Sequence, residues 1–113
     1  MKRRIFVASP LRADGAHGLY AIMQTMSHLD YMRDCVARVL DDGNAPFAPH
    51  GFYTYWLNDD VPADREAGIR AGSAWLLAAH EVHVFTDMGI SEGMRAEIAL
   101  AESEGIPVVM RTL

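Results

Sequence analysis

The chain has 113 residues, half of them hydrophobic, and a formal net charge of −5 at neutral pH. This length and apolar content fit one domain over residues 1–113 with a single core, and the negative charge argues against a nucleic-acid polymer as partner, because surfaces that bind phosphate backbones are basic. The lone Cys35 rules out an intrachain disulfide and offers no metal framework, and no apolar run approaches the ~20 residues of a membrane span. We therefore expect a cytoplasmic protein with neither a membrane nor a metal as partner.

The first half of the chain predicts a strand, a long helix and a weak second strand. Ile5–Ala8 is a short apolar run that is typical of a buried parallel strand. A helix is expected to begin between His17 and Tyr20 and to stop at Asp41-Asp42-Gly43. Asn44–Pro49 is expected to form an edge strand at best, because its prolines cannot donate to a ladder. The helical stripe expected to face the core consists of Ile22, Met26, Leu29, Met32 or Arg33, Val36 and Leu40, and Met23 is also assigned to core packing.

The second half begins with an irregular segment and then alternates regularly between helix and strand. His50–Pro62 is rich in Tyr, Trp, Asn and Asp without a clear period, which predicts a functional loop. A helix from Pro62 or Ala63 to Ala79 follows, with acidic residues in its first turn. The remaining expected elements are a strand at Val82–Phe85, a helix from Ser91 to Glu104-Gly105 and a strand at Pro107–Met110.

This alternation predicts an α/β fold in which helices cover both faces of a parallel sheet. Ligands of such sheets bind beyond the carboxyl ends of the strands, where the strand order reverses. If the first and third strands are neighbours, the crevice is lined by Ser9 to Arg12, by Thr86-Asp87 and by the helix that opens at Ser91. Two separate motifs then meet in one place.

The start of the Ser91 helix has the features of an anion site. Its first amides have no intrahelical partners and carry the positive end of the helix dipole. Ser91 is a good N-cap, and Gly93 allows a ligand to approach the backbone. Glu97 lies four residues after Gly93, on the same helix face. A phosphate on the helix end would leave the rest of a nucleotide over this carboxylate.

Three segments resemble the nucleoside 2-deoxyribosyltransferase-like superfamily, and in particular its small branch common in phages and bacteria. They are Ser9-Pro10-Leu11-Arg12, Ala48-Pro49-His50 and Ile90–Ile98. In relatives that include 2′-deoxynucleoside 5′-monophosphate N-glycosidases, a glutamate of this helix attacks the anomeric carbon, and a serine six residues earlier binds the 5′-phosphate. Those positions match Glu97 and Ser91. The resemblance implies a flavodoxin-like or Rossmann-like three-layer sandwich with a sheet of about four strands in the order 2-1-3-4, and a homodimer or higher homo-oligomer whose partner residues complete the site. The sequence has no dinucleotide, P-loop or zinc signature, so we expect no cofactor.

One position departs from the pattern of the related hydrolases. They carry an aspartate three residues before a Trp-Leu pair, whereas here Gly72 precedes Trp75-Leu76 at that spacing. Asp64, Asp87 or an acid of the His50–Asp60 loop could take its place.

Breaking an N-glycosidic bond requires a carboxylate at the sugar and a proton donor for the departing base. We expect Glu97 to be the nucleophile, and Asp87 to hold a sugar hydroxyl or to act as general acid if Glu97 raises its pKa. An arginine fork suits phosphate, and aromatic or imidazole rings suit a base. The residues expected to bind substrate are Ser9, Pro10, Leu11, Arg12, His50, Tyr53, Ser91, Gly93 and Met94.

Each of these residues also has a structural explanation. Glu97 would otherwise be a solvated helix acid, Ser91 a plain N-cap and Arg12 a member of a surface ion pair. The aromatic loop could pack on the core or form a subunit interface. The leading hypothesis is therefore an enzyme that cleaves or transfers the N-glycosidic bond of a nucleoside 5′-monophosphate. The alternatives are a protein that binds a nucleotide or nucleotide-derived metabolite in the same phosphate cradle without chemistry, and an assembly or regulatory protein.

Overall fold

Four parallel strands form the sheet, in the order β2-β1-β3-β4. The computed structural model describes residues 2–12 and 18–113. The strands are β1 (Arg4–Ala8), β2 (Ala45–Phe47), β3 (Glu81–Phe85) and β4 (Val108–Arg111), and the helices are α1 (Gly18–Asp41), α2 (Pro49–Tyr53), α3 (Pro62–Leu77) and α4 (Glu92–Ser103). The predicted Rossmann-like α/β fold and strand order are confirmed. His17, the earliest start considered for the first helix, lies outside the described residues.

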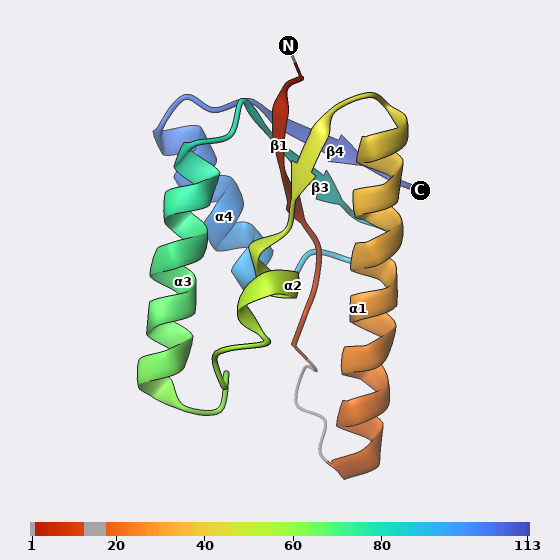
Figure 1. The fold of residues 1–113 in the computed structure, drawn as a ribbon, viewed down its shortest axis with the longest axis vertical. Coiled ribbons are helices and arrows are strands. Elements are labelled where there is room, and N and C mark those ends of the chain that lie inside the picture. Colours follow the sequence, from red (N-terminus) through yellow and green to blue (C-terminus); the bar gives the residue numbers. More distant parts are fainter. Residues whose placement is uncertain (1, 13–17) are drawn as a thin grey trace.

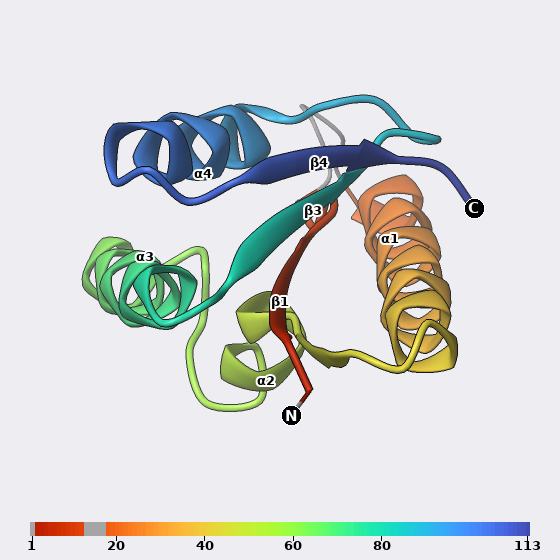
Figure 2. The same cartoon turned by 90° about the horizontal axis from the view of Figure 1, so that it is seen from above.

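The helices cover both faces of the sheet. Figure 2 shows α1 on one face and α3 with α4 on the other. The strand period of two divides the side chains between two cores. Ile5 and Val7 of β1 join the core under α1, whereas Phe6 and Ala8 join the core under α3 and α4. This alternation along an interior strand explains why the run is apolar without interruption.

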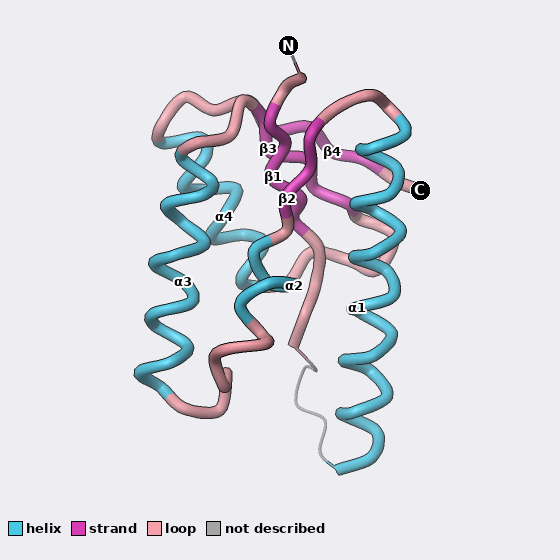
Figure 3. The backbone as a smooth tube through the Cα atoms, in the orientation of Figure 1, coloured by secondary structure: helices cyan, strands magenta, loops and turns pink. Residues whose placement is uncertain are grey.

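The apolar stripe predicted for α1 is wrong in its first half and at its last member, Leu40. Ile22, Met23 and Met26 are 57%, 59% and 60% exposed, and Leu29 and Leu40 are exposed as well. A 24-residue helix is about 36 Å long, about twice the length of a five-residue strand, so α1 continues past the strands (Figures 1 and 3), where the sheet no longer covers it. The face of α1 that is buried consists of His28, Tyr31, Met32, Cys35 and Val39.

The segment after β2 contains a short helix where the sequence predicts only irregular structure. Pro49 begins α2, because the fixed φ of proline suits the first position of a helix and its missing N–H is not needed there. Turns lead from Tyr53 to α3, and the amide of Asn58 donates to a carboxylate oxygen of Asp64 at 3.0 Å. The edge strand predicted in Asn44–Pro49 is the three-residue β2. Through these turns, α2 lies beside α3 and faces the start of α4 (Figure 1).

No helix in the described ranges is both long enough and apolar enough to cross a membrane.

Candidate active site

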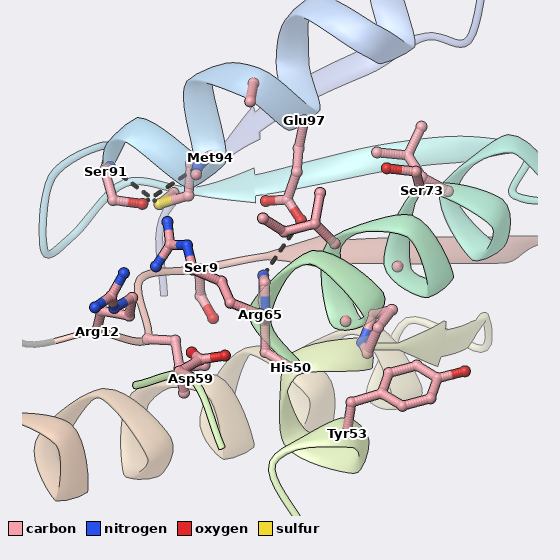
Figure 4. Close-up of a pocket in the computed structure, with 18 of the residues that line it drawn as sticks. Ser9, Arg12, His50, Tyr53, Asp59, Arg65, Ser73, Ser91, Met94 and Glu97 are labelled. Atoms are coloured by element: carbon pink, nitrogen blue, oxygen red, sulfur yellow. Dashed lines mark hydrogen bonds and ion pairs between the residues drawn. The ribbon is translucent and has the colours of Figure 1, made fainter. Parts of the chain in front are cut away.

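A pocket of about 540 Å³ lies beyond the carboxyl end of β1, between α2, α3 and the beginning of α4. At this edge of the sheet, the chain leaves β1 through α1 toward β2 on one side, whereas β3, which leads into α4, lies on the other side of β1. Open parallel sheets bind ligands at such a point, where the strand order reverses. Figure 4 shows side chains from these separate elements converging on the pocket. From the predicted set, Ser9, Leu11, Arg12, His50, Tyr53, Ser91, Gly93, Met94 and Glu97 line it.

The first turn of α4 forms one end of the pocket. Ser91 is the N-cap, and its hydroxyl accepts a hydrogen bond from the amide of Met94 at 3.2 Å. The amide of Ser91 in turn donates to the sulfur of Met94 at 3.4 Å, which closes a reciprocal cap. A Cβ added at Gly93 would meet only Ser91 Oγ, at 3.9 Å, so the backbone here is open to an incoming group. The cap is local chemistry, which is why the sequence predicts it.

Glu97 projects into the middle of the pocket from the next turn of α4. Its side chain is 16% exposed, and its Oε2 lies 3.3 Å from Nε2 of His50. Its Oε1 is buried and, among the described residues, has no hydrogen-bond partner. Glu97 is thus not a solvated helix acid.

His50 is brought to Glu97 by α2. Burial disfavours the charged imidazolium, but the hydrogen bond and the negative charge of Glu97, together with the charge of Asp59, outweigh this effect and raise the pKa of His50. His50 therefore lies between carboxylates on two different elements. The sequence predicts His50 as a substrate-binding residue but gives no sign of this contact.

The predicted arrangement of Asp87 is wrong. Asp87 does not line the pocket; its Oδ2 accepts a 2.7 Å hydrogen bond from the hydroxyl of Tyr31, and its carboxylate also accepts from the amide of Leu113. The bond from Tyr31 holds the pKa of Asp87 below its ordinary value, opposite to the rise that a general acid next to Glu97 would need. The reason is the strand period: Asp87 follows Phe85 by two residues and shares its face, toward α1, whereas α4 covers the other face.

Pro10 is buried but does not line the pocket. Of the acids considered as substitutes at the Gly72 position, Asp64 receives the amide of Asn58, and Asp59 lines the pocket. Gly72 lines it as well, so the position at which the family resemblance led us to expect an acid does face this site.

Helix α3 supplies two polar side chains to the pocket that the sequence does not predict. Arg65 and Ser73 both come from α3 and line the pocket. Arg65 sits in the run Asp64-Arg65-Glu66, which has the composition of a solvated first turn. Only the packing of α3 against α2 and α4 decides which side chain of that run turns inward.

Comparison with known proteins identifies a family model that matches this chain and a solved structure with a similar fold. The family model described as "Domain of unknown function (DUF7768)" matches residues 3–111. The solved structure of a 2-deoxyribosyltransferase from the psychrotolerant bacterium Bacillus psychrosaccharolyticus is similar, with a TM-score of 0.68 at 15% sequence identity, over 96% of this chain and 72% of that chain. No curated protein matches the chain. The structural likeness confirms the nucleoside deoxyribosyltransferase-like fold that the sequence motifs suggest.

Proposed function

The chain belongs to the DUF7768 family, and from its pocket we propose that it cleaves or transfers the N-glycosidic bond of a nucleoside 5′-monophosphate, with Glu97 as the nucleophile. The fold that it shares with a 2-deoxyribosyltransferase is compatible with this chemistry. The substrate and the nucleophile rest on the pocket itself.

The observation that carries the proposal is the position and state of the Glu97 carboxylate. It lies in the pocket between the capped end of α4 and the walls formed by α2 and α3, and its Oε1 is buried without a partner in the described part of the chain. A buried acceptor without a partner costs about 1–3 kcal/mol, and a substrate group that binds to Oε1 would recover this cost. The bond that this carboxylate would form to C1′ of a bound sugar gives such a group a function in the pocket.

The proposed reaction has two steps. Glu97 forms a bond to C1′ of the sugar while the C1′–N bond breaks, and the bond electrons leave with the base, which takes up a proton. Water or the nitrogen of a second base then attacks C1′, loses a proton and restores the Glu97 carboxylate. The base takes its proton from solvent, and the proton released in the second step returns there; Asp59, which lines the pocket, stays a carboxylate that acts on His50.

His50 acts in this scheme as a positioning residue. A sugar ring does not fit between two atoms 3.3 Å apart, so His50 stays on the same side of the sugar as Glu97 and cannot reach the opposite face, from which the base departs. Its proton orients Oε2 and stabilises the carboxylate each time the glycosyl bond to Glu97 breaks.

The test measures release of free base from a panel of ribo- and deoxyribonucleoside 5′-monophosphates by chromatography. Glu97→Gln should lower base release at least about 1000-fold while nucleotide binding, followed by calorimetry, and the unfolding temperature stay close to those of the parent protein. Glu102→Gln, an exposed acid on the same helix, is the matched control and should be as active as the parent. Base release by Glu97→Gln at the parent rate would overturn the assignment.

A second candidate is a protein that binds nucleotides in the same pocket without chemistry. It is favoured by Gly72, which leaves the pocket without the acid of the related hydrolases. In that case calorimetry detects nucleotide binding, but no substrate of the panel releases base.

A further inference from the structure

Arg65 lies at the end of the pocket that the capped turn of α4 forms. Its backbone is part of the first turns of α3, where its amide donates to the carbonyl of Val61 at 2.9 Å. Its side chain crosses the pocket, and Figure 4 shows it pointing from α3 toward Ser91, on the same side of Glu97 as Arg12. Two arginines from different parts of the chain thus flank one helix N-terminus.

A buried hydroxyl marks this end of the pocket independently. Ser9, directly after β1, is 2% exposed, lines the pocket, and its Oγ has no hydrogen-bond partner in the described ranges. A hydroxyl that is removed from water and left without a partner is costly, and a bound acceptor would satisfy it. The helix N-terminus therefore has a second group that can receive an anion.

Arg65 does not form an ion pair with a carboxylate of the described residues. Although Asp59 and Glu92 also line the pocket, no ion pair within 4.0 Å involves Arg65 among the described residues. Arg70, five residues later on the same helix, pairs instead with Glu66 at 2.8 Å in solvent. A half-buried arginine without a partner, facing a helix N-terminus, is suited to a planar or tetrahedral oxyanion.

We propose that Arg65 is the residue that makes this pocket select nucleoside 5′-monophosphates over nucleosides, by binding the phosphate together with the first turn of α4. The inference depends on the proposed function for the placement of the nucleotide, but it does not depend on bond cleavage. A nucleoside would leave Arg65 without a partner, whereas a monophosphate fills the end of the pocket that Arg65, Ser9 and Ser91 form. Selectivity then arises from a helix that lies outside the three segments that carry the family resemblance.

The test compares Arg65→Gln with Arg70→Gln in calorimetric titrations with 2′-deoxynucleosides and their 5′-monophosphates. Arg65→Gln should weaken monophosphate binding by roughly 10- to 100-fold, the loss of a charge-assisted contact, and should change nucleoside binding by less than about twofold. Arg70→Gln should bind both ligands as the parent does. Equal losses for both ligands, or no loss for the monophosphates, would overturn the inference.

Inorganic phosphate gives a second readout that needs no nucleotide. Phosphate should raise the unfolding temperature of the parent protein above its value in chloride of the same ionic strength, and Arg65→Gln should lose this shift. A parent protein that neither phosphate nor any monophosphate stabilises contradicts the inference. Monophosphate binding that depends on Arg65, without release of base, would instead sink the catalytic proposal and leave the role of Arg65 intact.

Discussion

Nε2 of His50 lies 3.3 Å from Oε2 of Glu97, which joins the short helix after β2 to the helix after β3 inside one pocket. The contact links a nucleophile candidate to a group whose charge changes near neutral pH. The protonation of His50 should therefore affect both the unfolding temperature and the rate of base release.

The first prediction concerns pH. The pKa of His50 is raised in the folded chain, so its contact with Glu97 stabilises fully below the ordinary histidine pKa of about 6.5 and is lost as the pH rises through the raised value. The difference in unfolding temperature between the parent and His50→Gln should therefore shrink with rising pH. The rate of base release should fall over the same interval in the parent, because Glu97 loses its charged partner, and this basic limb should be absent in His50→Gln.

His80→Gln is the histidine control for this experiment. His80 lies before β3, at the opposite end of the strands, where its Nδ1 accepts from the amide of Arg4. The variant should keep the basic limb of the parent. A limb that persists in His50→Gln would exclude His50 as its source.

The second prediction separates the two roles of Ser91. Ser91→Ala removes the cap of α4 and should cost about 1 kcal/mol of the free energy of unfolding, measured by urea denaturation. Ser91→Asp keeps a good cap, so it should unfold near the parent, but its charge should repel a phosphate at the same place. Nucleotide affinity should therefore fall further in Ser91→Asp than in Ser91→Ala. Equal or stronger nucleotide binding by Ser91→Asp would show that no phosphate lies there.

The third prediction places an acid at Gly72. A Cβ at this position would meet only Pro49 Cβ, at 3.8 Å, which is an ordinary contact, and a helical glycine is itself unfavourable. Gly72→Asp should fold with a free energy of unfolding within about 1 kcal/mol of the parent, and it should release base faster because the acid position of the related hydrolases is filled. Gly68→Asp, one turn earlier on the same face, is the control, and its rate should not rise. A rate for Gly72→Asp no higher than that of the parent would contradict the prediction.

The fourth prediction concerns self-association, which the family resemblance implies. The exposed apolar side chains at the start of α1 form a face that no other described element covers, and we propose that a second copy of the chain covers it. Ile22→Glu combined with Met26→Glu should shift the molecular mass in sedimentation equilibrium from dimer to monomer. Leu40→Glu, at the other end of the helix, should leave the mass unchanged. A parent protein that is monomeric at all concentrations would refute this interface.

Local patterns were sufficient for the order of the elements other than α2 and for one wall of the pocket. The apolar runs of β1 and β3 predict interior parallel strands, since both faces of such strands are buried. Gly93 and Glu97 share one helix face through the helical period alone, and Ser91 caps the same helix, so this part of the site is predictable before any packing is known. The recognised motifs consist largely of such residues.

What the sequence by itself determined is the fold class and the part of the site that lies within a single turn or helix. Tertiary structure alone decided how side chains of other elements are placed around it: His50 lies at Glu97, Arg65 points toward Ser91, and Asp87 is turned away toward Tyr31. It also decided that the first half of α1 extends past the sheet with its apolar side chains exposed. The physical reason is that backbone geometry fixes neighbours within one element, whereas the rotation of one element against another is set by the packing of many side chains far apart in the sequence.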